Sequence, residues 1–109
     1  MASSVAFQIE DPGDAGAIPV GNCGSVQLVT ASAETRTIAA PSYLGQLLNL
    51  SLKTDGGDCV ITVATAVNQT ANTVLTFADA GDHILLVAAQ SGSTLRWRVV
   101  CNDGVSLSS

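Results

Sequence analysis

Charged and aromatic side chains are scarce in this chain of 109 residues, where they make up 12% and 4% of the sequence. An ordinary soluble domain has roughly 25% charged residues. Because hydrophobic residues reach 47%, the surface must be built mostly from Ser, Thr, Asn, Gln, Ala and Gly. Such a surface tolerates being covered by another protein, so we expect an oligomer or a component of a larger assembly.

Basic residues are the scarcer charged class, with four Lys and Arg against nine Asp and Glu and a net charge of −5. Binding to nucleic acid requires clustered Lys and Arg that neutralise phosphates, and four such residues cannot supply a cluster. We therefore expect no nucleic-acid partner.

The chain also lacks the long apolar runs of membrane proteins and of secretory signals. No stretch approaches the roughly 20 apolar residues of a membrane span, and the opening segment MASSVAF has no basic region followed by an apolar one. We expect no membrane partner and synthesis in the cytosol. The cysteines, Cys23, Cys59 and Cys101, are odd in number without a C-x-x-C pair. This pattern predicts reduced thiols that serve as small buried hydrophobic side chains.

The chain has few residues that could act in catalysis or hold a cofactor. His83 is the single histidine, and neither Ser91 nor Cys59 lies in a recognisable nucleophile frame. Three isolated cysteines and one histidine do not form a zinc set. We expect no enzyme activity and no cofactor; a small hydrolase would require His83 within hydrogen-bond reach of a serine or cysteine.

Period-2 alternation of apolar and polar residues runs through the body of the chain, and no segment has helical periodicity. We predict strands over 25–31, 35–39, 46–54, 59–66, 73–77, 83–89, 94–101 and 105–107. Seven or eight short strands predict a single compact antiparallel β-sandwich or a small barrel, jelly-roll-like in form. Residues 1–22 differ, with two of the three prolines, and predict an extended N-terminal arm before an all-β domain over 23–109.

Three Asp-x-Gly-Asp quartets interrupt the strand pattern, at 11–14 (DPGD), 55–58 (DGGD) and 79–82 (DAGD). Asp caps its own backbone and Gly supplies positive φ, which is typical of turns. We expect the second and third quartets to be hairpin turns and the first to be a hinge between arm and body. Calcium binding is the alternative, because paired carboxylates attract hard cations, and two quartets meeting in space would favour it.

Four segments, 33–41 (AETRTIAAP), 53–59 (KTDGGDC), 97–100 (WRVV) and 102–104 (NDG), resemble small all-β proteins of tailed bacteriophages. The resemblance covers about residues 11–107. It implies a virion structural role as a capsid decoration or cement protein, which binds the major capsid protein as a homotrimer on the outside of the head. The expected location is therefore the capsid surface of the virion, after synthesis in the cytoplasm of the host bacterium.

An arm of this kind would contact the partner through its apolar alternation and its hinge. The candidate contact residues are Val5, Phe7, Ile9, Asp11 and Pro12. An extended segment can add a strand to a neighbouring protein, which fits this role.

The alternative function is an adhesive or receptor-binding module on the virion surface that recognises a glycan. It requires an exposed aromatic side chain or an Asp-rich cleft, whereas Phe77 and Trp97 fit core positions. Arg96 and Arg98 share one strand face, where we expect surface or interface ion pairs with a nearby acid rather than a ligand clamp.

Overall fold

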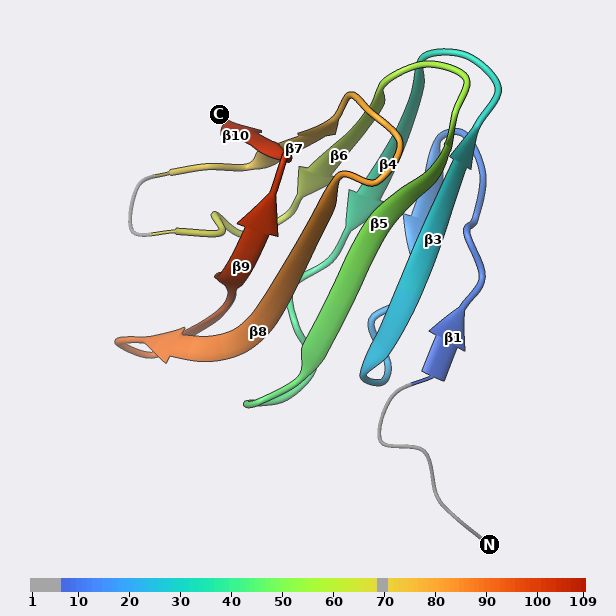
Figure 1. Cartoon of the computed structure of the whole chain (residues 1–109). Helices are drawn as coiled ribbons and strands as arrows, with labels where there is room; N and C mark the ends of the chain where they lie inside the picture. The colour runs from blue at the N-terminus through green and yellow to red at the C-terminus, as the bar shows by residue number, and fades with distance from the viewer. Residues whose placement is uncertain (1–6, 69–70) are drawn as a thin grey trace, which may run out of the picture.

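Ten β-strands form two packed sheets in the computed structural model, which describes residues 7–68 and 71–109 (Figure 1). Sheet A has the order β1 (Phe7–Ile9), β3 (Gly24–Thr30), β5 (Leu47–Asp55), β8 (His83–Ser91) and β9 (Thr94–Asp103). Sheet B has the order β10 (Ser106–Ser108), β7 (Val74–Phe77), β6 (Cys59–Val63), β4 (Glu34–Ile38) and β2 (Gly16–Ile18). The predicted all-β sandwich is confirmed. No helix among these residues is long and apolar enough to cross a membrane.

Both sheets are mixed, with a parallel half and an antiparallel half. β1, β3 and β5 run parallel in sheet A, and β2, β4 and β6 run parallel in sheet B. The antiparallel pairing that we predicted holds for β8 with its two neighbours and for β7 with its two neighbours. The parallel half also departs from a jelly roll, whose strands are antiparallel.

The two hairpins predicted at the second and third quartets are wrong. β5 and β6 lie in opposite sheets, as do β7 and β8, so each quartet carries the chain across the sandwich. A hairpin at 55–58 was impossible because β5 is hydrogen-bonded to β3 on one side and to β8 on the other. The connection at 31–33 likewise crosses between the sheets. β8 and β9 do form a hairpin, with Ser91 paired to Thr94, in the gap between the predicted strands 83–89 and 94–101.

Three of these crossings stack on one another. β1 and β2, β3 and β4, and β5 and β6 are successive arches, each with one strand in sheet A and the next in sheet B. Because each strand pairs in parallel with its counterpart in the neighbouring arch, all three crossings lie at the same end of the sandwich, which we call the arch end. The β7–β8 crossing joins them there, since β8 runs antiparallel to β5 (upper end of the view in Figure 1).

The core lies between the sheets and follows the predicted alternation. Leu48, Leu50 and Leu52 of β5 are at most 1% exposed, and Trp97 of β9 is fully buried. Every second residue of β3, β6 and β8 points inward in the same way. Burying these side chains is the main favourable contribution to folding, at about 25 cal/mol per Å² of apolar surface.

A bulge in β9 changes the face on which its last residues lie. Leu86 pairs with Val99 but Leu85 pairs with Cys101, so Val100 is an extra residue. Cys101 is therefore exposed, although simple alternation predicted it on the Trp97 face. The prediction of buried thiols holds for Cys59 and is wrong for Cys101; all three cysteines are free.

Residues 7–18 are part of the sandwich and do not form an extended arm. β1 is the outer strand of sheet A and β2 is the outer strand of sheet B, and Ile9 packs against the core. The reason is that these residues form the first arch, which pairs on β3 and β4. Of the predicted contact residues, Val5 lies outside the described part of the chain, as do all of residues 1–6.

Candidate functional site

Charge is separated along the long direction of the strands. All nine acidic residues lie in or beside the four crossings and the end of β9 at the arch end. Arg36 and Lys53 lie at the arch end as well, so nine negative and two positive side chains give this end a net charge of −7. The remaining two cations, Arg96 and Arg98, lie toward the opposite end and restore the total of −5.

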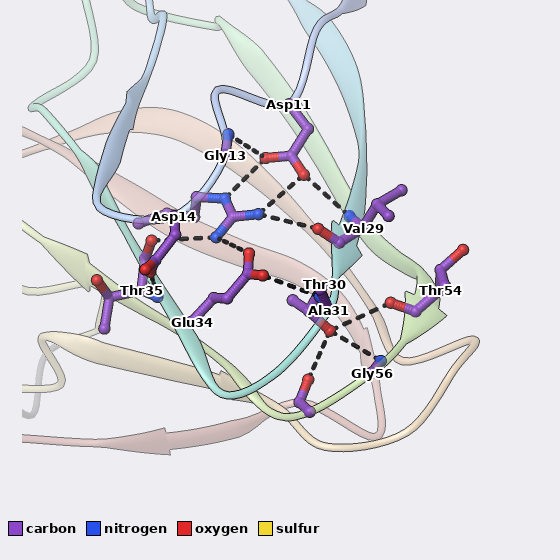
Figure 2. Close-up of polar contacts among 12 residues, drawn as sticks. Asp11, Gly13, Asp14, Val29, Thr30, Ala31, Glu34, Thr35, Thr54 and Gly56 are labelled. Carbon is purple, nitrogen blue, oxygen red and sulfur yellow. Dashed lines mark hydrogen bonds and ion pairs between the residues drawn. The ribbon is translucent and has the colours of Figure 1, made fainter.

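A buried arginine organises the arch end, and Figure 2 shows the polar contacts there, with Asp11, Glu34 and Val29 labelled. Arg36 occupies an inward-facing position of β4 and is 0% exposed. Its Nε donates to Asp11 Oδ1 at 2.7 Å and its Nη2 donates to Asp11 Oδ2 at 2.9 Å, so that the carboxylate binds the guanidinium side-on. Glu34 Oε1 lies 3.0 Å from Nη1, and the carbonyl oxygens of Thr35 and Val29 accept further hydrogen bonds. Sequence reasoning missed this centre, although Arg36 is in phase with Ile38.

Asp11 ties the first arch to its neighbours through the same carboxylate. Besides Arg36, it accepts hydrogen bonds from the backbone N–H of Val29 at 2.9 Å and of Gly13 at 3.2 Å. Burial by itself would raise the pKa of Asp11, but the hydrogen bonds from Arg36, Val29 and Gly13 outweigh it and hold the pKa below its usual value. The hydrogen bond to Asp11 raises the pKa of Arg36. The first quartet therefore holds two arches together and is not a free hinge.

The second quartet brings two arches into backbone contact. A Cβ at Gly56 would meet the backbone of Thr30 and Ala31, and a Cβ at Gly57 would meet that of Ser32 and Ala33. The Thr30 hydroxyl fills the junction, 2.7 Å from Gly57 O and 3.1 Å from Gly56 N. The glycines of this quartet thus allow close approach rather than positive φ.

The third quartet is a capped turn. Asp82 is 9% exposed, and its Oδ2 accepts hydrogen bonds from the backbone N–H of Ala78 at 2.9 Å and of Asp79 at 3.0 Å. Gly81 has a φ of +95°. The carboxylate of Asp82 is thereby used within its own turn, as expected of Asp in turns.

The calcium alternative finds no support in this arrangement. Among residues 7–68 and 71–109, no group of three or more His, Cys, Asp or Glu side chains is placed to hold a metal ion. The carboxylates of Asp11 and Asp82 instead face backbone N–H groups and, for Asp11, Arg36. The quartets share one end of the fold without converging on a point.

His83, the one histidine, faces an amide. Its Nε2 is hydrogen-bonded to Asn49 Oδ1 on the neighbouring strand of sheet A. The hydrolase hypothesis required a serine or cysteine nucleophile at that position, and no hydrogen bond joins His83 to one within the described residues. That the protein is not an enzyme stays a prediction.

The aromatic side chains that a glycan site needs are mostly inside the fold. Phe77 and Trp97 are fully buried, and Trp97 Nε1 donates to Ala39 O at 3.0 Å. Tyr43 is 42% exposed, but its hydroxyl lies 3.1 Å from Cys23 Sγ.

Hydrogen bonds from the Tyr43 hydroxyl and the Leu47 N–H lower the pKa of Cys23, whereas burial raises the pKa of Cys59 to about 11.

Arg96 and Arg98 lie side by side on the outer face of sheet A, on either side of the buried Trp97. Neither arginine forms an ion pair with any described residue. The two ion pairs found among residues 7–68 and 71–109 both involve Arg36. The Nε atoms of both arginines are shielded from solvent and have no hydrogen-bond partner. An ion pair within the chain, which we had predicted as one option, is therefore absent from the described residues.

The predicted contact residues that the structure describes lie along one edge. Phe7 and Ile9 belong to β1, and Asp11 and the exposed Pro12 follow it in the first crossing. A hollow of about 290 Å³ lies beside this edge and is lined by Gln8, Ile9, Glu10, Asp11 and Gln27.

No protein-family model matches this chain, and no curated protein is similar enough to it to count as a relative.

Proposed function

We propose that this protein decorates the capsid of a tailed bacteriophage, where it binds the major capsid protein on the outside of the head as a homotrimer. The observation that carries the proposal is the place of β1. Among residues 7–68 and 71–109 this strand is paired with β3 alone, so its other edge leaves peptide groups that can pair with a strand of another protein. The hollow beside it, lined by Gln8 and Gln27, has room for a side chain of that strand.

The outer face of sheet B supports an assembled state. Ala17, Thr37 and Thr62 form one row across three strands, and Ala39 and Ala64 extend the surface. These exposed side chains are small and uncharged. A surface of this kind loses little hydration when it is covered, which suits a protein embedded in a shell.

Co-sedimentation with purified phage heads tests the proposal. We expect Gln8→Arg to weaken binding, because it places a long charged side chain across the hollow beside β1. Ser106→Arg is the matched control, since Ser106 is an exposed residue of an outer strand of the other sheet, and it should bind as the wild type does. Equal binding of both variants would show that the contact with the head lies elsewhere on the protein. Capsid decoration itself would be refuted by a wild-type protein that neither binds the heads nor raises the melting temperature of the heads.

The glycan-binding alternative makes a different prediction for the same protein. It requires binding on a glycan array that depends on Asp79, Asp82 or His83. Because Trp97 and Phe77 lie in the core, we favour the structural role.

A further inference from the structure

The outer face of sheet A carries a patch that combines cations with exposed apolar side chains. Leu47, Val87 and Arg98 form one row across β5, β8 and β9, and Ala89 and Arg96 form the next. Leu47 is 42% exposed, and Leu44, three residues earlier in the loop before β5, is 66% exposed. We call Arg96 and Arg98 with Leu47 and Val87 the arginine patch.

The arginines of this patch are short of acceptors. A guanidinium that binds a carboxylate side-on donates one hydrogen bond from Nε and one from an Nη, as Arg36 does to Asp11 at 2.7 and 2.9 Å. In Arg96 and Arg98, Nε is shielded from water and donates to nothing in the described residues. A carboxylate from another molecule cannot reach an atom that is shielded in this way, but the Nη groups of both arginines are not shielded and also have no acceptor among the described residues. The patch is therefore suited to receive carboxylates from outside the chain through its Nη groups.

Carboxylates without a partner are found on the same molecule, at the arch end. Asp55, Asp58 and Asp79 are exposed. None of the three side chains makes a hydrogen bond or an ion pair with any described residue, in contrast to Asp11 and Asp82. The arch end cannot reach the arginine patch of its own molecule, because the strands of sheet A separate them.

We propose that the arginine patch of one molecule binds the acidic arch end of a second molecule. The two surfaces are complementary in charge, since the arch end carries a net −7 and the patch carries the two remaining cations of the chain. The contact joins two different surfaces and is therefore head-to-tail. In a closed ring of such contacts, each molecule uses its arginine patch once and its arch end once. The inference rests on the self-association proposed above and gives it an interface.

Two variants separate the two sides of this contact. Variant P, Arg96→Gln with Arg98→Gln, removes the cations, and variant E, Asp55→Asn with Asp58→Asn and Asp79→Asn, removes carboxylates. The replaced side chains have no partner within the described chain, so both variants should fold, which circular dichroism and thermal melting check. Lys53→Gln is the control, because it removes a cation from the arch end rather than from the patch.

Sedimentation velocity of the full chain at 20 and 500 mM NaCl gives the result. We expect the wild type and Lys53→Gln to associate at low salt, with an affinity about tenfold or more lower at high salt. Variants P and E should each be monomeric alone. An equimolar mixture should form a one-to-one dimer and nothing larger, because only the patch of variant E and the arch end of variant P remain intact.

The outcomes that overturn the inference differ from those that overturn self-association itself. A wild-type oligomer that keeps its size in both variants and at high salt has another interface, while the homotrimer proposal stands. A mixture of P and E that stays monomeric also overturns the head-to-tail contact. A wild type that is monomeric at 20 mM NaCl at all concentrations removes both the interface and the homotrimer.

Discussion

Removal of Asp11 should destabilise this fold more than removal of any exposed acidic residue. Arg36 is fully buried, and Asp11 binds it through two hydrogen bonds of 2.7 and 2.9 Å. Asp11→Ala leaves a buried guanidinium with Glu34 as its remaining acidic partner, and it also leaves the N–H groups of Val29 and Gly13 without their acceptor. Breaking a buried ion pair by removal of one partner costs about 3–5 kcal/mol.

Because Glu34 still lies 3.0 Å from Nη1, we expect the lower end of that range, about 3 kcal/mol. For a domain of about 100 residues, 1 kcal/mol shifts the melting temperature by about 4 °C, so the variant should melt about 12 °C below the wild type. Urea unfolding at pH 7, followed by circular dichroism, gives the free energy of unfolding directly. Asp58→Ala is the matched control and should lose less than about 0.5 kcal/mol, since Asp58 is an exposed quartet residue whose side chain has no partner in the described chain.

A double-mutant cycle with Arg36→Met separates the ion pair from the general effect of the substitution. In the Asp11→Ala background, Arg36→Met removes the charge that lost its partner, so it should cost less than it does in the wild type. The expected coupling free energy is about 1–3 kcal/mol. An Asp11→Ala loss below about 1 kcal/mol, or additive losses in the cycle, would show that the arch end is not held by this pair.

Three further predictions follow from the same geometry. The pKa of Asp11 is lower in the folded state than in the unfolded state. The stability that this carboxylate contributes is therefore fully present above the unfolded pKa near 4 and is lost as the pH falls through the folded pKa. The difference in unfolding free energy between the wild type and Asp11→Asn should shrink over that acid range. Cys23 should be alkylated in the native protein at pH 8, whereas Cys59, whose pKa burial raises to about 11, should react only after unfolding. Mass spectrometry of the labelled peptides measures both rates, and labelling of both cysteines at equal rates would contradict the burial of Cys59. Gly56→Ala should lose about 1–3 kcal/mol because its Cβ meets the backbone of Thr30, while Gly21→Ala, with open space around it, should change the urea midpoint little; equal midpoints would contradict the close contact of the arches.

Much of the secondary structure could be predicted because burial leaves a local mark on the sequence. The alternation in β5, with Leu48, Leu50 and Leu52 inward, is the same whichever strands lie beside it. Strand ends were predicted within about three residues for the eight strands from β3 to β10. β1 and β2 were missed, because three-residue strands in a segment with prolines are too short to show a period.

The candidate site was harder to predict than the strands. Arg36 carries a weak signal, its inward phase with Ile38, but its partner Asp11 is 25 residues away and no local rule connects them. The unpaired state of Arg96 and Arg98 is likewise invisible in the sequence, since it depends on which acids come near in three dimensions.

The sequence alone determined most of the apolar core positions, where the chain turns and how little charge the surface carries, because each of these depends on residues close together in the chain. The burial of Arg36 and the exposure of Cys101 depended on the tertiary structure. The tertiary structure decided what the turns connect. An Asp-x-Gly-Asp turn can reverse a chain within one sheet or carry it across to another, and the flanking alternation is identical in both cases. At 55–58 the choice was made by β3 and β8, which occupy both edges of β5. The same kind of crossing after β1 and β3 makes β1, β3 and β5 parallel, so the first three crossings share one end of the sandwich. The start of β8 and the end of β9, which run antiparallel to their neighbours, bring the remaining carboxylates to that end.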